Sequence, residues 1–328
     1  MNKEKVLKTL YSAGDYISGE KISDSLNISR AAVNGHIKNL RSEGYDISSV
    51  TNKGYRLNKI PDILNTETLG LFLNDTGRIS FFDSINSTNI KLKELAANNA
   101  PEGSVVISNE QTSGRGRLGR TFESGKNVGI YLSYLMRPAG MEAISTLTAR
   151  TAVMVRKAIV DAYGIDTRIK WVNDIMLNDR KAVGILTELS TESESGFINN
   201  AVIGIGVNVK KTLFPKEIEN IATSLENESG RSDLLRARLA AEIIKDLDIL
   251  SKEFPADSGY YLDEYRKYCI STGKDVKVIN NADNTERKAR SLDINPDFSL
   301  KVRFEDGTVK DIFSGEVSVR GLCGYLPD

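Results

Sequence analysis

Several residue types are scarce in this chain of 328 residues, and each scarcity narrows what the protein can be. There are two cysteines, Cys269 and Cys323, without a CxxC spacing, so we expect two free thiols in a reducing cytoplasm. No apolar run approaches the roughly 20 residues that a membrane helix needs. The first residues begin an amphipathic pattern and not a signal peptide. These absences predict a cytoplasmic protein with no membrane-spanning segment.

The single histidine, His36, restricts the possible chemistry further. It lies in a segment with the pattern of a DNA-reading helix. In the rest of the chain we therefore expect no Ser–His–Asp triad, no Cys–His pair and no histidine-ligated metal. Any chemistry there must depend on lysine, arginine, asparagine, aspartate and backbone amides.

The formal net charge is zero, but the charges are unevenly distributed. Residues 1–60 contain ten Lys or Arg and six Asp or Glu, a surplus of four positive charges that residues 61–328 balance. A basic end on an acidic body indicates a nucleic-acid-binding module attached to another domain. The length allows two or three domains, and 40% hydrophobic with 27% charged residues is typical of a globular protein.

The pattern of residues 1–60 predicts a winged helix-turn-helix. Apolar spacing favours a helix over 2–13, Ser18 and Ser29 can cap two more, and a hairpin with a basic tip follows over 45–57. The third helix would enter the major groove and the hairpin would contact phosphate. We expect the DNA-facing residues to be Arg30, Asn34, His36, Lys38, Arg41, Lys53 and Arg56. A protein-interaction module of the same fold is the alternative, and the local charge favours DNA.

Residues 114–120 read Gly-Arg-Gly-Arg-Leu-Gly-Arg and predict a loop that wraps an anion. Glycine lets the backbone lie close to a ligand, and arginine supplies donors suited to phosphate or carboxylate. The spacing satisfies G-x-G-x-x-G, but no helix pattern follows it, which disfavours a Rossmann site. Gly119 to Lys126 misses the P-loop by one residue, and Asn127 replaces its Ser or Thr. A solvated surface loop is the remaining alternative.

Three shorter motifs accompany this loop. Ser87-Thr88-Asn89 stand at a predicted helix start, where they could bind a polar ligand or simply cap the helix. Gly204 and Gly206 lie within a predicted strand, which suggests close approach by a ligand or another backbone. Trp171, the only tryptophan, has polar neighbours and could wall a ligand or lie in the core.

Beyond a linker at 58–65 the pattern predicts an α+β domain and then a small barrel. We expect helices near 66–74, after residue 89, and at 140–163, 215–221, 231–254 and 260–269, with strands at 79–83, 103–110, 128–136 and within 168–209. Short turns within 168–209 predict an antiparallel meander, which again disfavours a Rossmann sheet. Five short strands between 275 and 320, with a hairpin at Asp306-Gly307, predict the barrel.

Taken together, these features resemble the bifunctional biotin–protein ligases, also called biotin operon repressors. The motifs that carry the resemblance are Ser87-Thr88-Asn89, Gln111, residues 114–120, Lys170-Trp171-Val172-Asn173-Asp174, Arg180-Lys181, Gly204-Ile205-Gly206-Val207-Asn208 and Gly315-Glu316-Val317-Ser318-Val319-Arg320. The likeness covers nearly the whole chain. It implies a winged helix-turn-helix at 1–60, a ligase domain with a mixed or antiparallel sheet at 66–270, and an SH3-like β-barrel at 271–328.

The resemblance implies an enzyme that is also a repressor. Biotin and MgATP would form biotinyl-5′-adenylate and pyrophosphate, and the biotin would pass to a lysine of a biotin carboxyl carrier protein, part of acetyl-CoA carboxylase or a related carboxylase. The adenylate-bound form would pair into a homodimer on operator DNA and repress biotin biosynthesis. Joining a carboxylate to a phosphate brings anions together, so cations must offset their repulsion.

The resemblance also implies roles for individual residues. The catalytic set would be Arg115, Asn173, Asp174 and Lys181. Biotin would contact Ser87, Thr88, Asn89, Gln111, Gly114, Arg115, Gly116, Arg117, Lys181, Gly184 and Gly204. The nucleotide would contact Arg117, Arg120, Lys170, Trp171, Asn173, Asn208 and Arg320. Asn173 and Asp174 would face phosphates and Mg²⁺, with no dedicated protein metal site, and Phe214 or a neighbour would pack on adenine.

Two departures from the family and two alternative functions stay open. Val172 stands where the family most often has proline, and Leu118 where arginine or methionine is frequent. A biotin-sensing repressor without catalysis would share the fold, but it does not need a phosphate-handling set. A lipoate-type acyl–protein ligase would share the catalytic core. We also expect Arg115→Ala to retain adenylate poorly, because the loop loses a cation.

Overall fold

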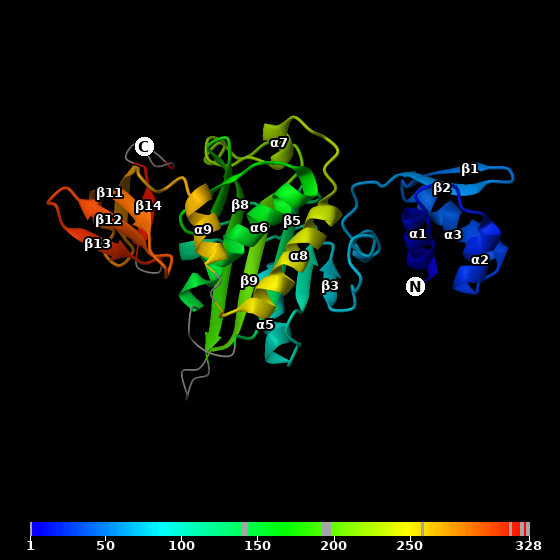
Figure 1. Ribbon diagram of the computed structural model, residues 1–328, viewed down its shortest axis with the longest axis horizontal. Helices are drawn as coiled ribbons and strands as arrows, with labels where there is room; N and C mark the ends of the chain where they lie inside the picture. The colour runs from blue at the N-terminus through cyan, green and yellow to red at the C-terminus, as the bar shows by residue number, and fades with distance from the viewer. Residues whose placement is uncertain are drawn as a thin grey trace. The chain divides into compact units, whose positions relative to one another are not determined.

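The computed structural model describes residues 2–138, 144–191, 198–256, 259–314, 317–321 and 325 (Figure 1). The chain divides into two compact units. One comprises Met1–Gly77 with Leu235–Ala241, and the other comprises Arg78–Leu234 with Glu242–Asp328. Cys323 lies outside the described residues, and Cys269 is a buried free thiol.

The N-terminal domain is a winged helix-turn-helix, as predicted. Its elements are α1 (Asn2–Ala13), α2 (Gly19–Leu26), α3 (Arg30–Ser42), β1 (Asp46–Val50) and β2 (Gly54–Lys59). The side chains of Ser18 and Ser29 accept hydrogen bonds from backbone amides three residues on, so both act as the expected N-caps. The stripe of Val33, Ile37 and Leu40 is fully buried against α1 and α2.

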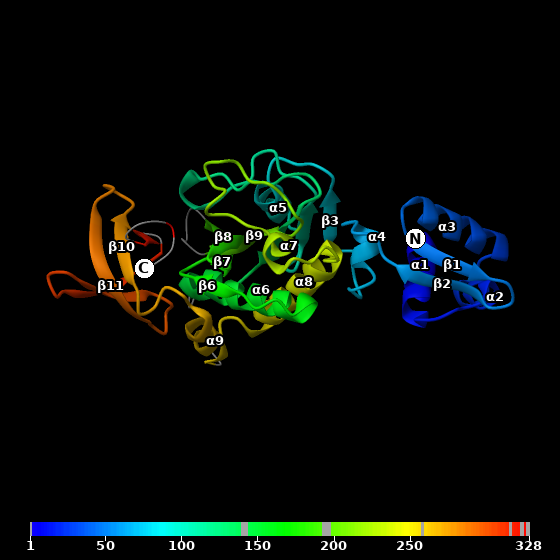
Figure 2. The same cartoon turned by 90° about the horizontal axis from the view of Figure 1, so that it is seen from above.

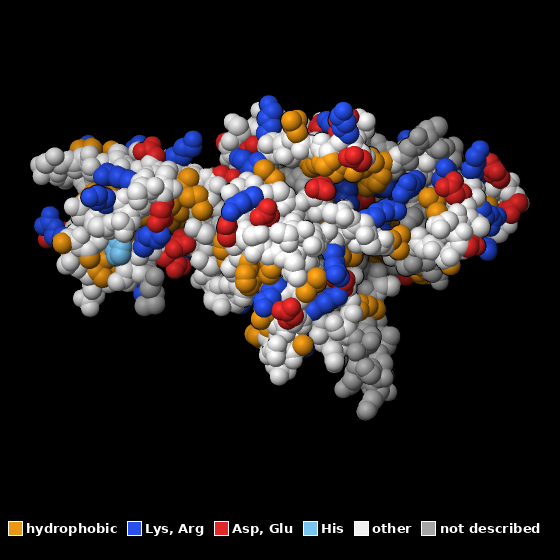
Figure 3. Space-filling model, turned by 180° about the vertical axis from the view of Figure 1, so that it is seen from behind, with side chains coloured by type: hydrophobic (Ala, Val, Ile, Leu, Met, Phe, Trp, Pro, Cys, Tyr) orange, Lys and Arg blue, Asp and Glu red, His pale blue; other side chains and the backbone are white. Residues whose placement is uncertain are grey.

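The opposite face of α3 is accessible. Arg30, Asn34, Lys38 and Arg41 are exposed there, His36 is half-buried at the edge, and Lys53 and Arg56 are exposed on the hairpin. Lys and Arg side chains lie on the surface of this domain beside the single histidine (Figure 3). Arg41 also donates to the carbonyl of Ile47, so it helps to hold the hairpin on the helix.

The predicted linker is anchored to a helix far along the chain. Asp62 accepts hydrogen bonds from the backbone amide (2.8 Å) and the Nε (2.9 Å) of Arg236, whose side chain is 3% exposed. The helix predicted at 66–74 is shorter, because α4 (Thr66–Leu69) begins with a capping box between Asn65 and Thr68 and ends at Gly70. The carboxylate of Asp62 therefore orders the chain just before this turn.

Removing the Arg236 guanidinium should strongly destabilise the unit that comprises Met1–Gly77 and Leu235–Ala241. Arg236→Met removes the buried guanidinium that pairs with the Asp62 carboxylate, and breaking such a pair costs about 3 kcal/mol. Urea unfolding followed by circular dichroism would measure the loss. Arg238→Met is the matched control, because Arg238 lies two residues on and is exposed. Equal unfolding midpoints for the two variants would contradict the anchoring role.

A mixed seven-stranded sheet forms the centre of the second unit. It contains β3 (Ile79–Phe82), β4 (Val105–Ser108), β5 (Gly129–Met136), β6 (Arg168–Lys170), β7 (Asp174–Leu177), β8 (Arg180–Thr191) and β9 (Ile198–Asn208), in the order β3-β4-β5-β9-β8-β7-β6. Only β3 and β4 are parallel among the recorded pairs. The antiparallel meander from β6 to β9 confirms that prediction and excludes a Rossmann sheet here.

Helices cover both faces of this sheet. α6 (Leu147–Tyr163) and α8 (Arg236–Glu253) lie on one face, and α5 (Thr88–Ala97) lies on the other (Figures 1 and 2). Leu92 and Ala96 of α5 are buried with Val106, Leu135 and Val202 of the strands. The first residues of the predicted 140–163 helix, 140–143, lie outside the described residues, and 144–146 form a short 3₁₀ turn.

The helix predicted at 215–221 is wrong. This segment forms turns, with Ile218 N donating to Pro215 O and Ala222 N to Ile218 O, and its end pairs with β8 through Lys181 and Ala222. Pairing with a strand leaves those backbone groups unavailable to a helix. A short helix, α7 (Leu225–Ser229), follows it unpredicted, and α8 begins at Arg236, later than expected.

The C-terminal part folds as a five-stranded antiparallel, barrel-like sheet after α9 (Tyr260–Tyr268). Its strands are β10 (Asp275–Asn280), β11 (Glu286–Ile294), β12 (Leu300–Phe304), β13 (Val309–Ile312) and β14 (Val317–Arg320), in the order β13-β12-β11-β10-β14. Trp171 joins it to the central sheet, since its Nε1 donates to Phe298 O at 2.9 Å. Among the described residues, no helix is both long and apolar enough for a membrane span.

Candidate functional site

Two adjoining cavities lie at one end of the central sheet. The smaller is lined by the Ser87–Asn89 triplet, Gln111, Arg115 and the glycines of β8 and β9. The larger has a volume of about 590 Å³ and extends to the C-terminal sheet. The residues common to both walls are Gly116, Arg117, Phe122, Asn173 and Lys181. Two ligands, or two halves of one ligand, could therefore meet at these five residues.

The smaller cavity has a polar wall built at the start of α5. The Oε1 of Gln111 accepts hydrogen bonds from the backbone amide (2.9 Å) and the hydroxyl (3.0 Å) of Thr88. Ser133, buried on β5, donates to Asn89 Oδ1 at 2.5 Å or to the Thr88 hydroxyl at 2.8 Å. Ser87 makes no capping bond with its side chain. The triplet is thus a fixed polar surface and does more than cap a helix.

Glycines in the strands make room for this wall and for the loop that faces it. A Cβ on Gly204 would lie 2.3 Å from Asn89 Oδ1, and a Cβ on Gly206 would lie 2.4 Å from the ring of Phe122. Both distances are too short for any side chain. The glycines therefore admit a helix start and a loop residue to the same sheet face, as their position in a strand suggested.

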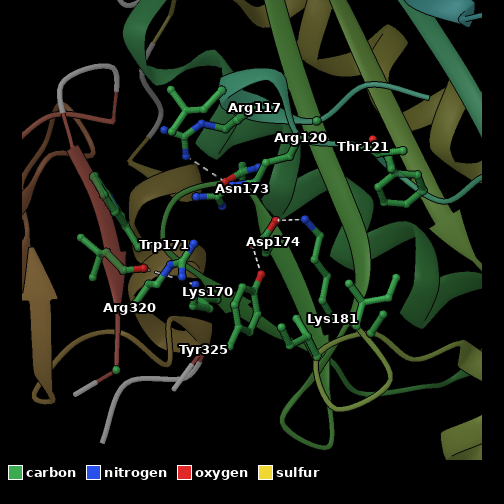
Figure 4. Close-up of a pocket in the computed structure, with 18 of the residues that line it drawn as sticks. Arg117, Arg120, Thr121, Lys170, Trp171, Asn173, Asp174, Lys181, Arg320 and Tyr325 are labelled. Atoms are coloured by element: carbon green, nitrogen blue, oxygen red, sulfur yellow. Dashed lines mark hydrogen bonds and ion pairs between the residues drawn. The ribbon is translucent and has the colours of Figure 1, made fainter. Parts of the chain in front are cut away.

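The larger cavity is rich in cations. Arg117, Arg120, Lys170, Lys181, Lys277 and Arg320 all line it. Asp174 lies among them, with Lys181 Nζ 2.5 Å from its Oδ1 and the hydroxyl of Tyr325 donating to its Oδ2 (Figure 4). Such a surplus of positive charge in a partly enclosed site favours a polyanion.

Burial and neighbouring charges set the protonation of two groups here. Burial lowers the pKa of Lys170 to about 8; Asp174 opposes this shift, and Lys181, Arg320 and Arg120 add to it. Burial alone would raise the pKa of Asp174, but Lys181 and Lys170 hold that pKa below its usual value. Near neutral pH the site therefore holds a charged carboxylate beside ammonium groups.

Arg117 connects the glycine–arginine loop to two other parts of the unit. It donates to Asn173 Oδ1 at 3.0 Å and to the carbonyl of Ser314. Burial lowers the pKa of its guanidinium. Asn173 is itself fixed, because its side chain donates to Ile185 O at 2.9 Å. It follows a cis peptide between Trp171 and Val172.

Residues 214–222, which include the segment predicted as a helix, form an apolar wall of the larger cavity. Phe214, Ile218, Ile221 and Ala222 line it. The backbone of Lys181 holds this wall, donating to Ile221 O at 2.7 Å and accepting from Thr223 N at 2.9 Å. Asn208 also donates to Thr223 O. A flat apolar ligand group such as a base could pack there beside the cations.

Most of the predicted site residues are brought together, with exceptions. Gly114 lines neither cavity; a Cβ there would lie 2.3 Å from Phe122 O, so its glycine serves the folding of the loop. Arg115 lines only the smaller cavity and is exposed. Trp171 lines the larger cavity, but its side chain is 5% exposed and donates a hydrogen bond to Phe298. Of the two roles predicted for it, it therefore mainly has the one in the core.

Several residues of the site were not predicted, and three of them make contacts that matter for the site. Phe122 lies in both walls, Ser133 bonds to the triplet from β5, and Tyr325 bonds to Asp174. Phe122 gave a usable signal, because it is an aromatic residue two positions after the arginine-rich loop. The other two gave none, since only the fold brings them near the site.

Family models match two parts of the chain. Residues 81–208 match the biotin/lipoate A/B protein ligase family, and residues 2–56 match an HTH domain. The first range contains the smaller cavity and most of the cation cluster. The second contains the three helices and the hairpin of the N-terminal domain.

Named proteins and solved structures agree with these models. The chain is 31% identical to the bifunctional ligase/repressor BirA of Escherichia coli over 316 residues, 96% of each chain. It is 45% identical to the protein of that name from Bacillus spizizenii over 222 residues, 66% of this chain and 68% of that one. A biotin protein ligase from Aquifex aeolicus in complex with biotin and ATP has a TM-score of 0.65 at 28% identity, covering 74% of this chain and 98% of that one.

Proposed function

This chain belongs to the family of bifunctional biotin–protein ligases that are also repressors, and from that premise we propose how its residues work. It activates biotin with ATP to biotinyl-5′-AMP and transfers the biotin to a biotin-dependent carboxylase. It also binds DNA as a transcriptional repressor.

One observation supports the assignment of roles: the three polar residues among the five that the two cavities share are Arg117, Asn173 and Lys181. Biotin would occupy the smaller cavity, where Ser87, Thr88 and Gln111 face its polar ureido end. ATP would occupy the larger cavity, with its phosphates among the cations and its base near Phe214. The biotin carboxylate and the α-phosphate would then meet at the three shared residues.

The first half-reaction joins two anions. A carboxylate oxygen of biotin attacks the α-phosphorus of ATP, and the bond to the β-phosphate oxygen breaks and releases pyrophosphate. Lys181 and Arg117 reach both ligands and offset the charge that gathers between them. Lys170, Arg120 and Arg320 line only the larger cavity and would hold the phosphates.

The acidic residues of the larger cavity fit a magnesium ion carried by the nucleotide. Asp174, Glu123 and Glu286 line it, and only Asp174 also touches the shared residue Lys181. Mg²⁺ prefers one or two carboxylates together with phosphate oxygens. Asp174 would hold the ion, which when bound supplies positive charge to the leaving pyrophosphate. Among the described residues, no cluster of three or more His, Cys, Asp or Glu side chains that could hold a metal ion is found.

The second half-reaction transfers the acyl group. The neutral amine of the acceptor lysine attacks the biotinyl carbonyl carbon, the C–O bond to AMP breaks, and the amine loses a proton to solvent. Negative charge develops on the carbonyl oxygen as the amine attacks. Lys181 would stabilise it from the shared wall, as oxyanion donors do.

The repressor function would depend on the exposed face of α3. Arg30, Asn34, Lys38 and Arg41 would lie in the major groove, with His36 at the edge and Lys53 and Arg56 on phosphates. The adenylate-bound form would pair into a homodimer, so that two recognition helices reach two half-sites. A gel shift with operator DNA should then require both biotin and ATP, and ligand-independent binding would count against this coupling.

Labelled biotin decides between the ligase and its alternatives. Incubation with MgATP and the biotin-accepting domain of acetyl-CoA carboxylase should transfer label to that domain. A non-catalytic sensor would bind biotin and transfer none. A lipoate-type ligase would transfer labelled lipoate in place of biotin.

The glycine at 204 should be needed for biotin binding. Gly204→Ala forces Asn89 away from Gly204 and narrows the smaller cavity, and overpacking of this kind costs about 2 kcal/mol. We expect the Kd for biotin to rise roughly thirtyfold by calorimetry. Gly35→Ala is the control, because a Cβ there meets nothing within 4 Å. Unchanged biotin affinity in Gly204→Ala would place biotin elsewhere.

A further inference from the structure

Tyr325 contributes one side chain to the wall of the larger cavity. Tyr325 lies five residues beyond the end of β14 and lines the cavity beside Lys170 and Asp174 (Figure 4). Its hydroxyl donates to Asp174 Oδ2. Tyr325 has no role in the two half-reactions of the proposed function.

With the Tyr325 hydroxyl, each of the two carboxylate oxygens of Asp174 has a partner. Lys181 takes Oδ1 at 2.5 Å, and Tyr325 takes Oδ2. A carboxylate held at both oxygens is restricted in its orientation. Lys181 and Tyr325 together therefore fix how Asp174 faces the cavity.

The tyrosine ring supports a second polar group. Lys170 Nζ lies 3.9 Å from the ring centroid of Tyr325, and it donates to the carbonyl of Val319 at 3.4 Å. Lys170 is 4% exposed, so its ammonium has little water around it. A ring face within about 6 Å stabilises a desolvated cation. Tyr325 thus contacts both charged residues of the β6–β7 turn.

We propose that Tyr325 is a positioning residue of the nucleotide phosphate subsite, holding Asp174 through its hydroxyl and Lys170 through its ring. The proposal rests on the proposed function, since it assumes that ATP occupies the larger cavity. It restricts the effect of Tyr325 to adenylate formation. Asp174 and Lys170 line the larger cavity only, where they would act on the phosphates that leave as pyrophosphate. Finished adenylate no longer carries those phosphates, so we expect Tyr325 to matter little for biotin binding and for transfer.

Two substitutions separate the two contacts. Tyr325→Phe keeps the ring and removes the hydroxyl, and Tyr325→Leu removes both. We expect the KM for MgATP in pyrophosphate–ATP exchange to rise about tenfold in the first, the scale of one hydrogen bond to a charged group. It should rise about a hundredfold in the second, because the cation–π contact is lost as well. Tyr260→Phe is the control, because Tyr260 is an exposed residue of α9 that lines neither cavity.

A second measurement keeps a folding defect apart from a positioning defect. Each variant is given biotinyl-5′-AMP made chemically, together with the carboxylase acceptor domain, and transfer is followed. The proposal expects transfer rates within about twofold of the parent. Equal losses in exchange and transfer would overturn it, as would an unchanged KM for MgATP in Tyr325→Leu. If the parent itself catalyses no exchange, the proposed function fails first, which is a different result.

Discussion

Replacing Lys181 with methionine is expected to lower both half-reactions by about a thousandfold, the cost of removing a charged donor from a developing anion. Lys181 lines both cavities, and its Nζ contacts Asp174 at 2.5 Å. Methionine keeps the length and packing of the stem and removes only the ammonium. The loss therefore measures charge stabilisation and not the collapse of the wall.

The two half-reactions should be measured separately. Pyrophosphate–ATP exchange reports adenylate formation, and transfer from chemically made biotinyl-5′-AMP reports the second step. Lys181→Met should impair both, whereas the Tyr325 variants should impair only the first. Lys91→Met is the matched control, since Lys91 forms an exposed ion pair with Glu94 on α5. Normal transfer by Lys181→Met would confine this lysine to adenylate formation.

The predicted motifs came together because the fold brings their elements to the same two adjoining cavities. Ser87-Thr88-Asn89 start α5, Asn173 and Asp174 form the turn into β7, and Gly204 and Gly206 lie on β9. These residues were predicted from their types and from the resemblance to the family, and the structure places them along the two cavities. The winged helix-turn-helix was predictable for a similar reason, because its caps and apolar stripe are local features.

The remaining parts of the site depend on contacts between distant segments. Tyr325 and Asp174 are 151 residues apart, and no local pattern relates them. The segment at 215–221 has helix-forming residues, but pairing with Lys181 on β8 decides its conformation. The partner of Asp62 was hidden likewise, since Arg236 follows it by 174 residues. Tertiary contacts overrode or completed the local signal in all three cases.

The arginines of the glycine–arginine loop should differ in how well they retain adenylate. Arg117 donates to Asn173 and to Ser314, so it ties the loop to the β6–β7 turn and to the C-terminal sheet. Arg115 is exposed, and the only backbone pairing recorded for it is with Thr121 in the same loop. Both line the smaller cavity, but of the two only Arg117 has recorded side-chain hydrogen bonds to residues outside the loop.

We therefore expect Arg117→Ala to release biotinyl-5′-AMP about a hundredfold faster than the parent, since two hydrogen bonds of a charged group are lost. Arg115→Ala should also release it faster, but by about tenfold, because only one cation of the cover is removed. Dissociation of labelled adenylate, chased with unlabelled adenylate, gives both rates.

Lys126→Ala is the control, because Lys126 pairs with Asp83 on the surface and lines neither cavity. If neither arginine variant releases adenylate faster than Lys126→Ala, the loop does not cover the ligand. If Arg115→Ala is the faster of the two, the cover is held by its charge alone and not by the tether from Arg117.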